Sequence, residues 1–314
     1  VPAERLLAEQ LNVSRRTVRA ALDALQTSGV VVQPGDGRQR RVASRAAQRG
    51  GETMLTDTIA LLSRTRPATS PGSRNQISTA LQAVSRQVES SGHHTLLIHP
   101  DRLEGRGIDS LLGTGVKGLL VIDEVDIAPS IQNGLEACRG NLPVVVRGYG
   151  PESQRYDRVI SDHEGGCRAL TRRLIDRGCR RILRFWRVTG KPPWLGLRNA
   201  GYERAMREAG LEPIPPLYMP EVPVEGISER SLHDRARLYA GYLVEHLKGP
   251  EPIDAIMVVT DAHAFQAAAS LRLLDVAPNE DVLIAGFDNL APHEPWAQWE
   301  PTGPLLTVDK NNDE

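Results

Sequence analysis

The chain has 314 residues, too many for a single hydrophobic core to be the default, so we expect two or three domains. Its composition, 40% hydrophobic and 25% charged, is ordinary for a soluble globular protein, and no apolar run reaches the roughly 18–20 residues needed to span a bilayer. The net charge of −1 divides unevenly, because nine Arg and four acids leave +5 in residues 1–51 and −6 in the remainder. A basic head on an acidic body indicates nucleic acid binding at one end.

The three cysteines argue against a disulfide framework and against a zinc site. Cys138, Cys167 and Cys179 are odd in number and form no CxxC pair. This usage fits a reduced cytoplasm better than a disulfide-rich compartment, and it suggests no zinc site. We therefore expect a cytoplasmic protein without a metal or cofactor.

The first residues predict a small helical unit that ends in a hairpin. Residues 4–11 predict a short helix, and Ser14 is a good N-cap for a second one because its hydroxyl accepts from a free backbone N–H. Gly29 is a suitable stop for that second helix. The strand-like segments 30–33 and 38–42 flank a Gly-rich turn. The order is helix, turn, helix, hairpin.

The second helix separates its arginines from its apolar face. Val18 and Leu22 lie on one side, whereas Arg16 and Arg19 lie about 100–200° away from Val18. Arg15 lies near the boundary, in the first turn, where backbone N–H groups are also available to a phosphate. Arg can bond phosphate oxygens or a guanine edge with two hydrogen bonds. A charged helix face is also commonly just solvated, so the wider context has to decide between the two interpretations.

That context is a short helix, a tight turn, an Arg-faced helix and a basic hairpin, the order of a winged helix-turn-helix. The stretch VPAERLLAEQLNVSRRTVRAALDALQTSGVV resembles the DNA-binding domain of the GntR family of bacterial repressors. The resemblance implies a domain over 1–42 whose own first helix would precede Val1, and Ala3 stands where the family often has a Ser cap. It also implies a set of DNA-facing residues that includes the wing, namely Arg5, Ser14, Arg15, Arg16, Thr17, Arg19, Gly37 and Arg38.

Residues 43–56 show no sustained period and predict a linker, after which short apolar runs alternate with helical stretches. Alternation of this kind predicts an α/β fold with parallel sheets. Nine strands favour two linked Rossmann-like lobes over a TIM barrel, which remains the alternative. The expected strands are 58–63, 95–99, 118–123, 143–147, 158–162, 181–186, 255–259, 282–287 and 305–308. The expected helices include 75–91, 163–177, 199–209, 229–247 and 262–274.

Charged residues follow many of these strands, at the edge where open α/β sheets bind ligands. They are Arg64, His99, Asp123, Arg147, Asp162, Arg187, Asp261 and Asp288. Carboxylates accept and arginines donate paired hydrogen bonds, so such a set suits a polyhydroxylated ligand. Considered alone, each of these residues is also explained as a charged side chain that is exposed to solvent at the end of a strand.

Four segments, in order, resemble LacI/GalR-type repressors: RVISDHEGGCRALTRRLIDRGCRRI, RNAGYERAMREAGL, IDAIMVVTDAHAFQAAASLR and EDVLIAGFDN. The resemblance implies a two-lobed periplasmic-binding-protein-like type I domain over 57–314, with closing elements that would follow Val308. Lobe 1 would comprise 57–161 plus 291–314, and lobe 2 would comprise 162–290. The resemblance further implies that Arg198 and Asp288 contact the effector. Arg147 and Trp194 fall near positions that line the family's pocket, and Asp261 lies in a matched segment.

Several residues depart from the common sugar-binding pattern of that family. The loop 64–76 lacks the usual Asn-Pro-Phe-like stretch, Thr260 replaces a common Asn, and Arg147 stands where sugar binders often carry an acid. These departures favour an unusual ligand, such as an anion. Trp194 fits two roles equally well, stacking on a sugar face or packing within its loop.

The leading hypothesis is a ligand-responsive transcription repressor, in which a homodimer binds palindromic double-stranded DNA and a sugar or sugar derivative binds between the lobes. One alternative is a sugar-binding protein without DNA function. Another is an aminotransferase-like enzyme with pyridoxal phosphate, which would need a Schiff-base lysine. None of Lys117, Lys191, Lys248 and Lys310 lies in a convincing setting for that cofactor, and no GxSxG elbow occurs. We therefore expect no enzymatic activity.

Overall fold

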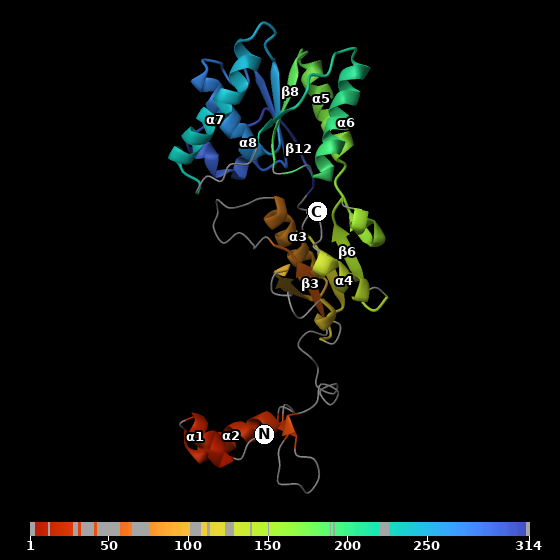
Figure 1. The fold of residues 1–314 in the computed structure, drawn as a ribbon, viewed down its shortest axis with the longest axis vertical. Coiled ribbons are helices and arrows are strands. Elements are labelled where there is room, and N and C mark those ends of the chain that lie inside the picture. Colours follow the sequence, from red (N-terminus) through yellow and green to blue (C-terminus); the bar gives the residue numbers. More distant parts are fainter. Residues whose placement is uncertain are drawn as a thin grey trace.

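The computed structural model describes residues 4–11, 13–27, 31–32, 41–42, 57–64, 76–100, 108–111, 114–122, 129–138, 140–149, 151–188, 190, 192–219 and 226–311. They form a helical head and a body of two α/β lobes, each with its own five-stranded parallel sheet (Figure 1). Two separate sheets exclude the TIM barrel alternative, since a barrel closes all its strands into one sheet. No helix in these ranges is both long and apolar enough to cross a membrane.

The head follows the predicted order. Helices α1 (Glu4–Leu11) and α2 (Arg15–Thr27) precede a two-stranded antiparallel ribbon of β1 (Val31–Val32) and β2 (Arg41–Val42). The N-cap expected at Ser14 is confirmed, because its Oγ accepts a 3.1 Å hydrogen bond from the Thr17 backbone N–H. The small core joins the two helices through Ala8, Val18 and Leu22. The hairpin tip, including the expected wing residues Gly37 and Arg38, lies outside the described residues.

The first lobe is a sheet in the order β4–β3–β5–β6–β7 with a helix layer on each face. Its strands are β3 (Thr58–Leu62), β4 (His94–Ile98), β5 (Gly118–Val121), β6 (Val144–Arg147) and β7 (Asp157–Val159). Helix α3 (Gln76–Ser90) covers one face, where Leu81 packs on Leu61. Helix α4 (Pro129–Cys138) and the 3₁₀ turn Ile108–Leu111 cover the other face, where Leu135 packs among the strands.

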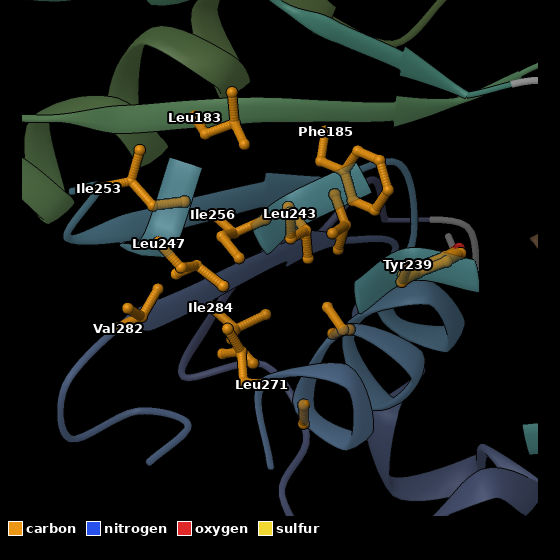
Figure 2. Close-up of a cluster of buried hydrophobic side chains, with 14 of the residues drawn as sticks. Leu183, Phe185, Tyr239, Leu243, Leu247, Ile253, Ile256, Leu271, Val282 and Ile284 are labelled. Atoms are coloured by element: carbon orange, nitrogen blue, oxygen red, sulfur yellow. The ribbon is translucent and has the colours of Figure 1, made fainter. Parts of the chain in front are cut away.

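The second lobe is a sheet in the order β12–β11–β10–β8–β9. Its strands are β8 (Ile182–Arg187), β9 (Leu217–Met219), β10 (Ala255–Val258), β11 (Leu283–Phe287) and β12 (Leu306–Val308). Alternate residues of each strand point to opposite faces. Leu183 and Phe185 therefore meet α7 (Glu229–Lys248) and α8 (Asp261–Leu273), as Figure 2 shows, while Trp186 packs towards α5 (His163–Asp176) and α6 (Pro193–Glu208).

All nine predicted strands are present, and two elements escaped prediction. Strand β9 is three residues long and lies among prolines, which are rare inside strands. Helix α4 contains Gly134, a weak helix former, and a Cβ there would lie 2.9 Å from that of Ile108. Helix α6 begins at Pro193, six residues before the predicted start, because Pro is well tolerated in the first turn.

The expected return of residues 291–314 to lobe 1 is not what the structure shows. Strand β12 pairs in parallel with β11, so it extends the sheet of lobe 2. The 3₁₀ turns Ala291–His293 and Pro295–Gln298 precede it, and Trp296 is buried against Leu232 and Phe265 of that lobe. Burial of this large apolar side chain and completion of the β11 edge explain why the segment stays on lobe 2.

Helices α5 and α6 approach each other closely at one glycine. A Cβ built on Gly201 would overlap the backbone oxygen of Glu164 and lie 3.0 Å from the backbone nitrogen of Arg168. Backbone atoms of a packed helix cannot move aside as a flexible side chain can. Gly201 therefore sets the distance between the two helices that flank the candidate site.

We expect Gly201→Ala to lower the free energy of unfolding by about 1–3 kcal/mol or more, because the added methyl group forces the helices apart. Gly241→Ala is the matched control, since this helical glycine has nothing within 4 Å of an added Cβ. The control should stabilise the protein by roughly 0.5–1 kcal/mol, the usual gain of Ala over Gly in a helix. Urea unfolding followed by circular dichroism measures both. Equal effects of the two variants would contradict the close contact.

Candidate effector site and DNA-binding head

Arg198 is the central buried cation of the body. It lies on α6 and is 1% exposed. Its Nη1 donates a 2.8 Å hydrogen bond to the carbonyl of Val259, just after β10. Its guanidinium carbon lies 3.6 Å from the ring centre of Phe287 and 4.6 Å from that of Trp194. Aromatic faces attract cations, so Arg198 ties α6 to the carboxyl ends of β10 and β11.

His163, the first residue of α5, is a member of the site that sequence reasoning missed. Its Nδ1 accepts a 3.3 Å hydrogen bond from Arg198 Nε. Its ring centre lies 5.0 Å from that of Tyr149 and 5.8 Å from that of Trp194. Burial, with the charges of Arg198, Lys310 and Arg147, lowers the pKa of His163 to about 2, so the ring is neutral at physiological pH.

Tyr149 follows β6, so through this residue lobe 1 contacts His163. Its hydroxyl donates a 2.6 Å hydrogen bond to the carbonyl of Ser161, in the segment that leads into lobe 2. Arg147, at the end of β6, is close enough to lower the pKa of His163. The structure thus brings the predicted residues Trp194 and Arg198 into contact with one imidazole, whose pKa the charge of Arg147 also lowers.

Asp288 directly follows β11 and forms an ion pair with Lys310. The Nζ–Oδ1 distance is 2.8 Å, and both side chains are 3% exposed. The backbone of Asp288 has φ +97°, a left-handed conformation that is unusual for a residue with a side chain. Lys310 escaped prediction as a site residue because a lysine near the end of the last strand carries no motif. Together with Phe287 and His163, Lys310 lines a cavity of ≈ 340 Å³.

Asp261 opens α8 and is completely buried. Its Oδ2 accepts from the backbone N–H groups of Leu290 (2.8 Å) and Ala291 (3.1 Å), and its Oδ1 accepts from the hydroxyl of Thr307 (2.7 Å). Burial raises the pKa of Asp261 to about 6, against the opposing effect of these hydrogen bonds. The carboxylate therefore anchors the loop that carries Asp288.

Other residues predicted at strand ends have structural roles or lie outside the described residues. The carboxylate of Asp162 caps α5, because its Oδ1 accepts a 2.8 Å hydrogen bond from the Gly165 N–H. Arg187, the last residue of β8, donates a 3.0 Å hydrogen bond to Gln266. Asp123 lies outside the residues that the structure describes. Because Asp162 caps α5, no bound ligand is needed to explain a carboxylate at this position.

The predicted DNA-facing residues of the head divide into two groups. Arg15 and Arg16 are exposed in the first turn of α2. Arg19 is also exposed, but its Nη2 forms a 2.9 Å ion pair with Glu4 of α1, while Arg5 lies 3.9 Å from Glu9. Ser14 and Thr17 share a 2.8 Å hydrogen bond between their hydroxyls. The first turn of α2 thus presents two exposed guanidinium groups beside two hydroxyls.

Two family models match the chain, and they match different parts of it. Residues 1–38 match the bacterial regulatory proteins of the gntR family, and residues 171–297 match a periplasmic binding protein-like domain. The chain joins a GntR-family head to a periplasmic binding protein-like body. The body match includes Trp194, Arg198, Asp261 and Asp288, and Arg147 precedes it.

Relatives and solved structures agree with this assignment. The chain is 29% identical over 197 residues to the HTH-type transcriptional repressor PurR of Aliivibrio fischeri, covering 62% of this chain and 52% of the relative. It therefore spans about half the length of the curated relatives it matches. A putative LacI-family regulator from Sanguibacter keddieii superposes with TM-score 0.54 at 25% identity, covering 82% of this chain and 85% of that one. A transcriptional regulator CelR–cellobiose complex superposes with TM-score 0.59 at 20% identity, covering 100% of this chain and 89% of that one. This likeness shows a shared fold.

We expect the ring of His163 in the periplasmic binding protein-like body to stay neutral far below the ordinary histidine pKa of about 6.5. The unfolded chain takes up a proton at this ring as the pH falls below about 6.5, whereas the folded chain does so only near pH 2. The stability that His163 contributes is thus present above pH 6.5 and is lost progressively below it.

Two-dimensional NMR of ¹⁵N-histidine protein would show the His163 signals unchanged between pH 7.5 and 5, and titrating normally in urea. Urea unfolding at several pH values, compared with His163→Gln, would show a smaller loss of stability on acidification in the variant. A native midpoint near pH 6.5 for His163 would contradict the buried neutral ring.

Proposed function

We propose that the protein is a ligand-responsive DNA-binding transcription regulator that acts as a repressor. The observation that carries the proposal is the union of an arginine-faced GntR-family helix-turn-helix with a two-lobed body whose buried polar residues converge beside a cavity. The curated relatives that it matches over about half their length are named as transcriptional repressors. They support regulation over catalysis, and we propose a cytoplasmic, non-enzymatic protein.

The DNA-binding half of the proposal rests on the start of α2. Arg15 and Arg16 are exposed there, next to the hydroxyls of Ser14 and Thr17 and to backbone N–H groups of the first helical turn. Such a surface offers bidentate donors to guanine edges and phosphate oxygens. Arg5, Arg19 and the wing residues Gly37 and Arg38 are proposed to complete the contact surface.

The effector-binding half rests on the convergence around Arg198. We propose that a sugar or sugar derivative binds between the lobes and contacts Arg147, Trp194, Arg198 and Asp288. Asp261 completes the proposed set by anchoring the Asp288 loop through its hydrogen bonds to Leu290 and Ala291. Guanidinium and carboxylate groups supply the paired donors and acceptors that hydroxyl-rich ligands need.

The link between the two halves is proposed to be a change in lobe geometry within a homodimer on a palindromic operator. Tyr149 of lobe 1 contacts His163 of lobe 2, which in turn contacts Arg198, so a ligand at Arg198 acts directly on the contact between lobes. An effector shifts DNA affinity only by the difference between its affinities for the two states. Two heads on a dimer then move relative to each other when the lobes close.

Arg16→Ala should weaken binding to the protein's own promoter by about tenfold or more, because it removes a charged DNA contact. The salt dependence of binding should become shallower as well, since fewer counterions are released. Fluorescence anisotropy with the full chain measures both quantities. Arg172→Ala, an exposed arginine of the body, is the matched control. Unchanged promoter affinity in Arg16→Ala would remove the DNA-binding assignment of α2.

Arg19 allows a sharper test because Glu4 holds its guanidinium at 2.9 Å. If Arg19 contacts DNA, Arg19→Ala weakens promoter binding by about tenfold, while Glu4→Gln leaves it equal or tighter. The reason is that Glu4 competes with phosphate for the same guanidinium. Parallel losses in both variants would instead show that the pair serves only to hold α1 on α2. The same anisotropy titration distinguishes these outcomes.

A further inference from the structure

A cavity of ≈ 340 Å³ lies where the chain passes from lobe 1 to lobe 2. Its walls come from the segment 160–162 between β7 and α5, from the first turns of α5, and from the ends of β11 and β12. Pockets for small molecules usually have volumes of about 300–1,000 Å³. The cavity therefore has room for one small ligand, and the imidazole of His163 is part of its lining.

His163 carries a buried hydrogen-bond donor that the protein does not use. Its Nδ1 faces Arg198 Nε at 3.3 Å, and an arginine can only donate, so Nδ1 accepts and the neutral ring carries its proton on Nε2. Nε2 is buried and has no hydrogen-bond partner among the described residues. A buried donor without an acceptor has lost its hydration without compensation. Of the two ring nitrogens, Nε2 is therefore the one left for a ligand.

Neighbouring groups fix the position and the charge of this ring. Its centre lies 5.0 Å from that of Tyr149 and 5.8 Å from that of Trp194, and Trp194 in turn packs on the guanidinium of Arg198. Burial is the main cause that lowers the pKa of His163 to about 2, so the ring keeps a single N–H at physiological pH. A fixed and uncharged donor distinguishes ligands by whether they place an acceptor atom at that point.

The carboxylates that line the cavity make no such demand on a ligand. Asp162 Oδ1 accepts from the Gly165 N–H at 2.8 Å. Asp309 accepts from the backbone N–H of Asn311 at 2.8 Å and from the side-chain amide of Asn289 at 2.9 Å. Each carboxylate thus already has a donor from the protein, whereas the imidazole N–H lacks an acceptor. The unmet requirement of the cavity is for an acceptor.

We propose that His163 is a specificity-determining residue of the effector site, and that its Nε2–H donates a hydrogen bond to an oxygen of the ligand. The inference rests on the proposed function and adds a requirement to it. The sugar or sugar derivative must present a hydroxyl, ring, carbonyl or carboxylate oxygen at this point. A methylene or an ammonium group there would leave the N–H without an acceptor, and sites built around a hydrogen bond reject such analogues strongly.

Two amide substitutions separate this role from the support of Arg198. Asn carries its amide oxygen near the position of Nδ1, so His163→Asn keeps an acceptor for Arg198 and removes the donor to the cavity. Gln carries its amide nitrogen near the position of Nε2, so His163→Gln keeps the donor and loses the acceptor. His233→Asn, at an exposed histidine of α7, is the matched control.

Thermal shifts of the full chain without DNA are measured with D-ribose, L-arabinose, D-glucose, D-galactose, cellobiose and glucose 6-phosphate as probes. At least one probe should stabilise the wild type in a saturable manner. For the probe that binds most tightly, calorimetric titration gives the Kd of each variant. His163→Asn should weaken binding about tenfold or more, whereas His163→Gln and His233→Asn should stay within about threefold of the wild type.

Three results would overturn the proposal: no stabilisation of the wild type by any probe, unchanged binding in His163→Asn, or a loss in His163→Gln as large as in His163→Asn. The third result would mean that the imidazole serves only to hold Arg198. Melting curves without sugar identify a variant that fails to fold. NMR of wild-type protein with ¹⁵N-histidine then decides, because the bound probe should shift the Nε2 signal and slow the exchange of its proton. An unchanged signal would refute the contact.

Analogues of the tightest-binding probe locate the oxygen that His163 contacts. Each analogue lacks one oxygen, and the ring oxygen is included in the series. One analogue should bind about tenfold more weakly than its parent to the wild type, yet equally to the wild type and to His163→Asn. Either change removes the same hydrogen bond, so the two losses should not add. Additive losses for every analogue would contradict a hydrogen bond from His163.

These measurements need no operator, so they separate this inference from the proposed function. Specific promoter binding without any sugar response would leave a regulator and overturn the role of His163. A sugar response that depends on His163 without promoter binding would keep that role and refute the regulatory function.

Discussion

The buried guanidinium of Arg198 is the interaction on which the rest of the candidate site depends. One side chain joins the end of β10 through the Val259 carbonyl, the end of β11 through the face of Phe287, and the start of α5 through His163. A cation at 1% exposure is stable only where several groups compensate its lost hydration. Loss of the guanidinium would therefore loosen three elements of lobe 2 at the same time.

Much of the fold follows from patterns that lie close together along the chain. Strands such as β3, β5 and β10 were predictable because parallel strands buried on both faces are continuously apolar over four or five residues. The capping role of Ser14 was predictable because it needs only a hydroxyl three residues before a free N–H. In contrast, β9 is too short and too rich in flanking prolines to give a signal.

The candidate site was predictable only in part, because its contacts join residues far apart in sequence. Arg198 and Asp288 fall within motif-like segments, whereas His163 acquires its role from Arg198, 35 residues away, and Lys310 acquires its role from Asp288, 22 residues away. The same limit applies to the lobe boundary, since pairing of β12 with β11 depends on which edge of a sheet is open. It also applies to Arg19, whose partner Glu4 lies on another helix. Local periodicity contains no information on any of these pairings.

The ion pair between Asp288 and Lys310 has a further consequence. The ammonium group belongs to the last described segment of the chain, which lines a cavity together with Ile160 and Ser161 at the passage between the lobes. A ligand that hydrogen bonds to this carboxylate competes with the lysine for it. Binding is then an exchange reaction, in which the incoming ligand displaces the ammonium group of Lys310 from the carboxylate of Asp288.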